Sequence, residues 1–193
     1  MKGAILYALS VFCLLTASCG SSDYSPKPRG YFKIDLPAKE YQSYKADCPF
    51  SFEYPVYASV VTDSARNAKP CWKDVVYESL NGRIHLSYQK IDSKAQFNEL
   101  IEDAHTFVFK HTVKATAIDE SVISMPDKSV YGIYYTIDGN AASPVQFFLT
   151  DSTKNYIRGA LYFNEQPRLD SIQPVLDFVK KDIDVMIRSF RWQ

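Results

Sequence analysis

The sequence predicts an α+β fold in a single domain, with an antiparallel sheet covered by helices. Short segments in which apolar and polar residues alternate lie on both sides of a central helical segment, and a second helical segment ends the chain. Turn-forming residues separate neighbouring strands, and the regular strand–helix alternation of a parallel sheet is absent. About 175 residues would remain after removal of an N-terminal signal, which is the length of one domain.

The folded domain is expected to span residues 31–193. From Phe32 to Leu36 apolar residues alternate with charged ones, which predicts a first strand stopped by Pro37. A second strand is expected over residues 50–54. Two further strands, over 72–77 and 83–88, should then pair as a hairpin around Asn81-Gly82, because this dipeptide is a strong turn former.

The central helix should begin after Ser93, because Ser93 and Gln96 have the spacing of a capping box. Its apolar residues recur at steps of three and four: Phe97, Leu100, Ile101, Ala104 and Val108. This stripe should pack on the sheet, while the acidic residues between its members form a solvated face.

Three strands are expected after the central helix, over residues 130–137, 145–150 and 156–163. The connections at 138–140 and 151–155 are rich in turn formers, so the strands should form an antiparallel meander.

A last helix should begin near Asp170 or Ser171, with Pro174 in its first turn, where a missing N–H costs nothing. One continuous apolar stripe runs along it: Ile172, Val175, Leu176, Val179, Ile183, Met186, Ile187 and Phe190. Such a stripe most often packs on a sheet. The order of all these elements resembles the Mog1/PsbP-like sandwich, an analogy of fold that says nothing of chemistry.

The N-terminus reads as a secretory signal over residues 1–18, because Lys2 precedes an apolar stretch too short to span a bilayer. It resembles a bacterial lipoprotein signal, in which Cys19 would become the first mature residue and carry lipid. The alternative is an ordinary signal peptide cut near Ala17. Residues 19–30 contain Gly, Ser and Pro without apolar periodicity and should be a flexible tether.

The charge balance and the cysteines limit the function further. Lysine plus arginine and aspartate plus glutamate number 22 each, so no basic field for nucleic acid is expected. Outside the cytoplasm, Cys48 and Cys71 should form a disulfide, the alternative being two free buried thiols. No zinc site is expected, since no CxxC occurs and the histidines lack ligand spacing.

No catalytic motif is present: the sequence lacks GxSxG, HExxH, P-loop and GxGxxG patterns. Polar side chains are nevertheless denser near the last three strands than a meander requires. The candidate interaction surface comprises Asp138, Asn140, Ser143, Asp151, Ser152 and Arg158. Arg158 should lie in mid-strand, either paired with Asp151 or Asp138 for structure or available to a ligand or partner, and Gly159 beside it indicates a bulge or a close backbone approach.

Several runs of the sequence carry a family resemblance: PKPRGYFKIDLP (26–37), CPFSFEYP (48–55), Cys71-Trp72, 84–88, 110–115 and, most closely, 139–143, 146–152 and 158–164. They resemble the GldD gliding-motility lipoproteins of Bacteroidetes. The resemblance implies a non-enzymatic lipoprotein of the gliding and type IX secretion machinery, whose partners are other envelope proteins of that machinery. It implies no cofactor and no catalytic residue.

The leading functional hypothesis is therefore an accessory or scaffolding lipoprotein of the cell envelope that acts by protein contact. Asp23 alone is too little for an acidic surface-export signal, so the protein is expected to face the periplasm. A periplasmic small-ligand-binding lipoprotein with a pocket near Arg158 is the alternative, and a hydrolase is a third and weaker one. A deep pocket with converging donors would favour the binder.

Overall fold

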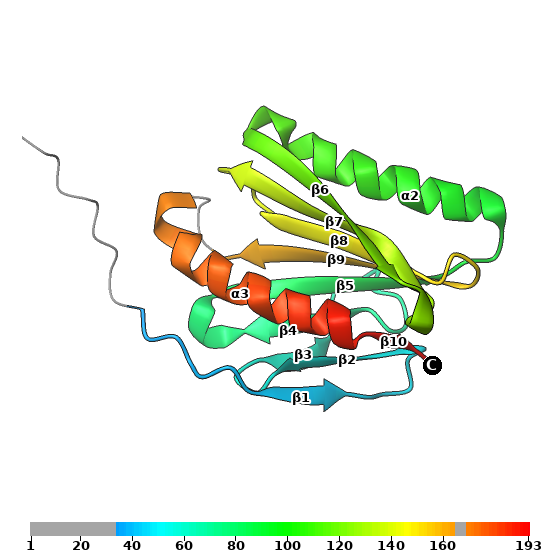
Figure 1. Ribbon diagram of the computed structural model, residues 1–193, viewed down its shortest axis with the longest axis horizontal. Coiled ribbons are helices and arrows are strands. Elements are labelled where there is room, and N and C mark those ends of the chain that lie inside the picture. Colours follow the sequence, from blue (N-terminus) through cyan, green and yellow to red (C-terminus); the bar gives the residue numbers. More distant parts are fainter. Residues whose placement is uncertain (1–33, 165–168) are drawn as a thin grey trace, which may run out of the picture. The chain divides into compact units, whose positions relative to one another are not determined.

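A seven-stranded antiparallel sheet forms the centre of the computed structural model, which describes residues 34–164 and 169–193 (Figure 1). The strand order is β3-β4-β5-β9-β8-β7-β6. These strands are Ser59–Thr62 (β3), Lys73–Tyr77 (β4), Gly82–Lys90 (β5), Ala115–Met125 (β6), Val130–Gly139 (β7), Val145–Thr150 (β8) and Asn155–Phe163 (β9). The α+β class predicted from the sequence is confirmed, and so is the antiparallel meander of the last three strands.

A second, smaller sheet has the order β1-β2-β10. Its strands are Tyr41–Tyr44 (β1), Phe50–Pro55 (β2) and Arg191–Trp192 (β10). The C-terminal strand therefore returns to pair with a strand from the start of the domain, with Trp192 opposite Phe50.

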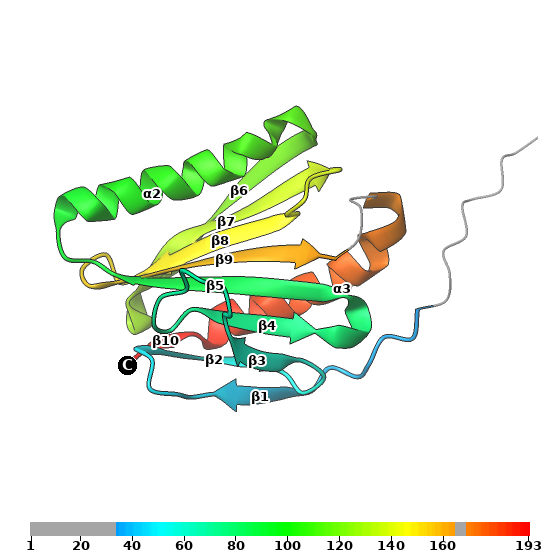
Figure 2. The same ribbon diagram turned by 180° about the vertical axis from the view of Figure 1, so that it is seen from behind.

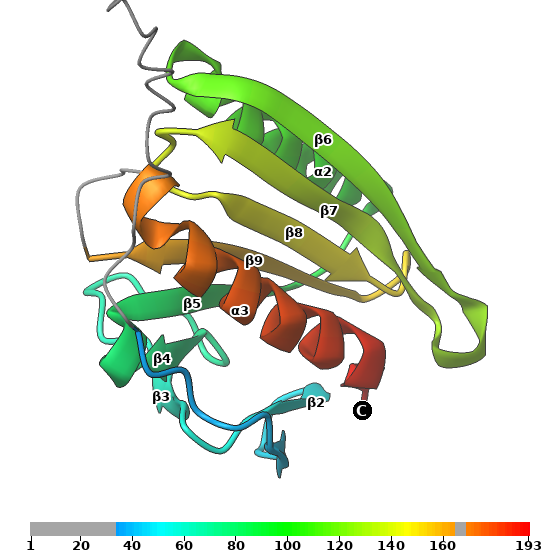
Figure 3. The same cartoon turned by 60° about the vertical axis from the view of Figure 1, so that its left-hand side comes forward.

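Two α-helices of the described residues cover opposite faces of the large sheet. Figure 3 shows α2 (Lys94–Phe109) behind strands β6 and β7, and α3 (Leu169–Ser189) on the opposite side in front of β9 and β5. The small sheet lies on the same side as α3. Both helices pack on the sheet, as the sequence predicts, and neither helix of the described chain is long and apolar enough to cross a membrane.

The larger core lies between α3, the small sheet and one face of the large sheet. The predicted stripe of α3 is buried in it from Val175 onward, with Val179 and Ile183 fully inaccessible, whereas Ile172 at its start is half-buried. Phe50 and Phe52 of the small sheet join this core, and the ring of Phe50 stacks on Phe190 at 6.0 Å between centroids. Burial of this many large apolar side chains supplies the main driving force for folding.

A smaller core lies under α2. Leu100, Ala104 and Val108 of the helix contact Phe148 and Tyr156 of the sheet. The N-terminus of the helix is capped as expected, since the Ser93 hydroxyl accepts a hydrogen bond from the Gln96 N–H at 3.1 Å. The Gln96 side chain in turn accepts from the Asp92 N–H at 2.7 Å, which completes a box-like cap.

The strand predicted from Phe32 to Leu36 is wrong where the structure describes it, because residues 34–40 form no strand. Ile34 and Leu36 are 37% and 39% exposed. An alternating pattern is held as a strand when one face covers a core, and the apolar side chains of this segment cover none. Pro37 also lacks the N–H that a strand ladder needs.

Two further details differ from the sequence-based expectations. The hairpin of β4 and β5 is present, but its strands are joined by a 3₁₀ turn over Glu78–Leu80 and a left-handed Asn81, with Tyr77 opposite Gly82. Helix α3 begins at Leu169, so Ser171 lies inside the helix and Pro174 lies beyond its first turn. Strands β1, β3, β6 and β10 were not predicted as such.

The described residues belong to one unit, Ile34–Gln193. The predicted signal peptide (1–18), the lipid site at Cys19, the tether (19–30) and the expected start of the domain at Tyr31 lie outside them.

Candidate functional site

Arg158 lies in the middle of β9 and is half-buried beside α2. Its Nη2 donates a hydrogen bond to Oε1 of Gln146, and its guanidinium carbon lies 4.8 Å from the centre of the Phe107 ring. The expectation that Arg158 pairs with Asp151 or Asp138 is therefore wrong within the described residues. A planar guanidinium can stack on an aromatic face while its N–H groups bond a side-chain oxygen, so Arg158 can make both contacts at once.

Glycine is needed at position 159 because the Phe147 ring lies close to the backbone there. A close approach was one of the two reasons expected from the sequence. A Cβ atom on this residue would lie 2.2 Å from Cζ of Phe147. The pairing of β8 with β9 continues through Gly159 without a change of register, so no bulge occurs.

Asp151 organises the turn between β8 and β9. Its Oδ1 accepts hydrogen bonds from the N–H groups of Thr153, Lys154 and Asn155 at 2.8, 2.7 and 2.9 Å. Burial alone would raise the pKa of Asp151, but these bonds and the Asn155 side chain outweigh it and lower the pKa below its ordinary value. Ser152 follows in a left-handed conformation, and its N–H donates to the Thr150 hydroxyl. The carboxylate thus has a structural role.

Asp138, at the end of β7, and Asn140 and Ser143, in the connection that follows, lie at the other end of β8. Ser143 is completely buried, and its hydroxyl donates to the Val145 carbonyl at 3.2 Å. Since β8 has six residues, roughly 20 Å separates this turn from that of Asp151 and Ser152. The six predicted residues therefore do not form one continuous surface.

The structure instead gathers polar side chains on the part of the sheet that α2 leaves uncovered. We name this surface the open face and define it by Asp74 of β4, Arg83, His85, Ser87 and Gln89 of β5, and Arg158 and Tyr162 of β9. Cross-strand pairs establish that these residues share a face: Asp74 is opposite His85, Ser87 opposite Arg158, and Arg83 opposite Tyr162. On the face of β5 and β4 that Figure 2 shows, no helix of the described chain covers these two strands, because α2 lies above them in this view and α3 lies behind them.

A pocket of about 280 Å³ opens where α2 meets the open face. Its polar wall contains Ser87, Gln89 and Arg158, and its apolar wall contains Trp72 and Phe107. Asp103 of α2 also lines it, so the pocket holds one charge of each sign. Nearby, burial and the charge of Arg158 lower the pKa of His111, which favours its neutral form.

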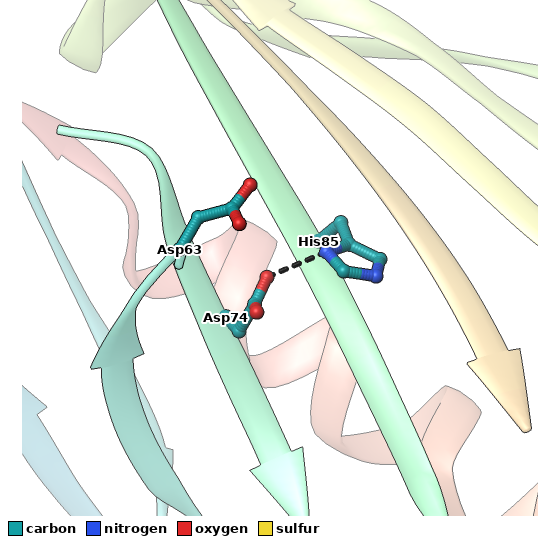
Figure 4. Close-up of side chains that lie close together, drawn as sticks. All are labelled: Asp63, Asp74 and His85. Carbon is teal, nitrogen blue, oxygen red and sulfur yellow. Dashed lines mark ion pairs between the residues drawn. The ribbon is translucent and has the colours of Figure 1, made fainter. Parts of the chain in front are cut away.

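The second cluster on the open face centres on Asp74, whose side chain is 3% exposed (Figure 4). Nδ1 of His85 lies 2.6 Å from its Oδ1, and Nη1 of Arg83 lies 3.2 Å from its Oδ2. The edge of the His85 ring meets the Tyr162 ring at 5.5 Å. Our sequence reasoning missed this cluster, although the predicted hairpin of 72–77 and 83–88 contains Asp74 and His85.

The predicted disulfide between Cys48 and Cys71 is present, with a Cα–Cα distance of 5.6 Å. Cys48 lies just before β2 and Cys71 just before β4, so the bond joins the two sheets. Cys71 itself has φ +64°, a left-handed conformation that ends the loop after β3.

No curated protein sequence matches the chain. We expected a Mog1/PsbP-like sandwich, and the solution structure of cyanobacterial PsbP (CyanoP) from Synechocystis sp. PCC 6803 is among the similar solved structures. The identity is 12% over 82% of this chain and 95% of that chain, with a TM-score of 0.45. The family model of the gliding motility lipoprotein GldD matches residues 21–192, so the chain belongs to that family.

Proposed function

We propose that this protein is a non-enzymatic lipoprotein, anchored through Cys19 with its domain facing the periplasm, and that it acts as an accessory or scaffolding component of gliding motility and type IX secretion. Membership of the gliding motility lipoprotein family implies involvement in gliding. The lone cysteine after a short apolar stretch supports the lipid anchor.

The observation that carries the scaffolding role is the open face. It combines half-buried Arg158, Tyr162 and Gln89 with Phe107, which is 41% exposed at the rim. Arginine and aromatic side chains are enriched in the centres of protein interfaces, where they supply large contact areas together with hydrogen bonds. A surface of this composition fits a protein partner.

A bulky charge in the open face tests the contact. Gln89→Arg should abolish gliding while the protein still accumulates in the envelope, because a long cation would obstruct a fitted interface. The matched control is Val122→Arg on β6, at a site that is 82% exposed outside the open face. If Gln89→Arg cells glide as the parent does, or if Val122→Arg cells fail equally, the open face is not the contact surface.

Lipid attachment is tested separately. Cys19→Ala should remove the label of a fatty-acid analogue, whereas Cys13→Ala, a cysteine inside the signal, should keep it. Equal labelling of the Cys19→Ala protein and the parent would contradict the anchor.

A small-ligand-binding role is the second candidate, and the pocket beside Arg158 favours it. The two roles differ in what accompanies the purified protein. A binder should release a stoichiometric small molecule on denaturation, and Arg158→Ala should lose it. A scaffold should lose its protein partner on the same substitution and release no such molecule.

A further inference from the structure

Three side chains from three successive segments meet at one edge of the open face (Figure 4). Asp63 follows β3, Asp74 lies in β4 and His85 lies in β5. One ligand-type atom from each, a carboxylate oxygen or an imidazole nitrogen, lies within 4.8 Å of the other two. Figure 4 shows the side chains pointing toward one another rather than along the sheet.

The oxygen at the centre of this group lacks a satisfactory partner. Oδ1 of Asp74 is buried and accepts no hydrogen bond of acceptable geometry, although Nδ1 of His85 is only 2.6 Å away. The two atoms are therefore close without being aligned as donor and acceptor. Burial of a carboxylate oxygen without a partner is costly, and a bound cation is a common way to remove that cost.

Each of the three side chains is also held from outside the group. Arg83 binds Oδ2 of Asp74 at 3.2 Å and leaves Oδ1 toward the cluster. One oxygen of Asp63 accepts the Ala65 N–H at 2.8 Å, which leaves its other oxygen available. The Tyr162 ring lies against the His85 ring. Such outer contacts orient the ligands of metal sites.

We propose that Asp63, Asp74 and His85 form a binding site for a divalent transition-metal ion, with Zn²⁺ as the best match. One imidazole nitrogen and two carboxylate oxygens are a donor set that suits zinc, whereas calcium and magnesium prefer oxygen donors alone. Three protein ligands leave a fourth position of a tetrahedral ion open. His85 is 39% exposed on its side chain, so the cluster can be reached from solvent.

The site goes beyond the proposed function and does not depend on it. An ion held here would fix the end of β3 to β4 and β5, because its ligands come from these three segments. Its open position could accept a side chain of a partner protein or a water molecule.

Equilibrium dialysis of Zn²⁺ against the full-length protein, purified in detergent without chelator, tests the site. The parent should bind one ion per chain. His85→Gln should weaken binding by more than the roughly 10- to 100-fold loss that follows removal of an outer-shell contact. The thermal midpoint of the parent should rise on addition of Zn²⁺, and that of His85→Gln should not.

The controls separate the site from adventitious binding. His105→Gln, an exposed histidine on α2, should bind Zn²⁺ as the parent does. Asp63→Asn should also lose binding, and it avoids the folding defect that loss of the buried Asp74 would bring. Absence of stoichiometric binding by the parent, or binding by His85→Gln equal to that of the parent, would overturn the assignment.

Discussion

Lys39 donates a hydrogen bond to Asp182 at 2.6 Å and so joins the segment before β1 to the middle of α3. The hydroxyl groups of Tyr41 and Tyr57 donate to the same carboxylate at 2.9 and 2.7 Å. The Lys39 ammonium also lies 3.2 Å from the centre of the Phe178 ring. Because the Asp182 side chain is completely buried, these donors supply the hydrogen bonds that water cannot give its carboxylate.

Asp182→Ala should destabilise the domain by about 3–5 kcal/mol, since it leaves the partly buried Lys39 charge and two tyrosine hydroxyl groups without their acceptor. Denaturant unfolding of the parent and the variant measures the difference. The matched control is Asp184→Ala in the same helix, whose exposed pair with Arg188 should contribute about 0–1 kcal/mol. Equal losses in the two variants would show that the buried pair has no special role.

The same network predicts how stability depends on alkaline pH. Burial, followed by the hydrogen bond to Asp182, raises the pKa of Tyr41 and Tyr57 above the ordinary 10.0. The folded state then keeps protons that the unfolded state loses, so this stabilisation is complete below about pH 10 and declines above it. Above that pH, each such tyrosine can lower the free energy of unfolding by about 1.4 kcal/mol per pH unit.

Lys39 opposes this trend, because burial lowers its pKa despite the hydrogen bond to Asp182. Between the lowered pKa of Lys39 in the folded state and 10.5, the unfolded state binds more protons than the folded state. The contribution of Lys39 to the free energy of unfolding therefore rises with pH in this range. Because two tyrosines oppose one lysine, the free energy of unfolding should still decline above about pH 10. Denaturant unfolding at a series of pH values checks this, and a free energy of unfolding that stays constant to pH 11.5 would contradict it. Tyr57→Phe should show a shallower decline than the parent.

The apolar stripe of α3 should be essential to the larger core. Val179→Asp or Ile183→Asp would place an unpaired carboxylate at a fully buried position and should lower the free energy of unfolding by several kilocalories per mole. Lys181→Asp, on the exposed side of the same helix, is the control and should melt close to the parent. If Val179→Asp melts like the parent, the stripe does not face the core.

Local periodicity explains why this stripe could be predicted. The spacing of its apolar residues depends only on the geometry of the helix, and the structure buries Val175, Leu176, Val179, Ile183, Met186 and Ile187. Asp182 could not be identified in the same way. It reads as a polar residue next to the stripe, and its partner Lys39 is 143 positions earlier in the chain.

The cluster of Asp74 and His85 escaped prediction for a different reason, namely register. A two-residue turn at Asn81-Gly82 would place Leu80 opposite Arg83 and so move Asp74 away from His85. The 3₁₀ turn over Glu78–Leu80 instead places Tyr77 opposite Gly82, which sets Asp74 opposite His85. The type of turn therefore decides which side chains meet on the open face, and the sequence did not determine that type.

Arg158 gives the prediction that separates a contact role from a structural one. Its side chain bonds Gln146, which is only 1% exposed and whose Nε2 has no hydrogen-bond partner among the described residues. Arg158→Ala should therefore cost about 1–3 kcal/mol through the lost hydrogen bond and the lost contact with Phe107. Arg158→Lys keeps the charge but not the planar group that covers the ring, so it should recover only part of the loss.

If the open face binds a protein, Arg158→Ala should also abolish gliding at a temperature well below its melting midpoint, while the lipoprotein still accumulates in the envelope. Measured thermal midpoints and immunoblots of the membrane fraction establish that condition. Arg188→Ala, which removes an exposed arginine of α3, should leave gliding intact. Normal gliding of the Arg158→Ala cells would remove Arg158 from the interface. Disappearance of the variant from the envelope would show that its contact with Gln146 and Phe107 serves the fold, since the loss of function would then follow from the loss of the protein.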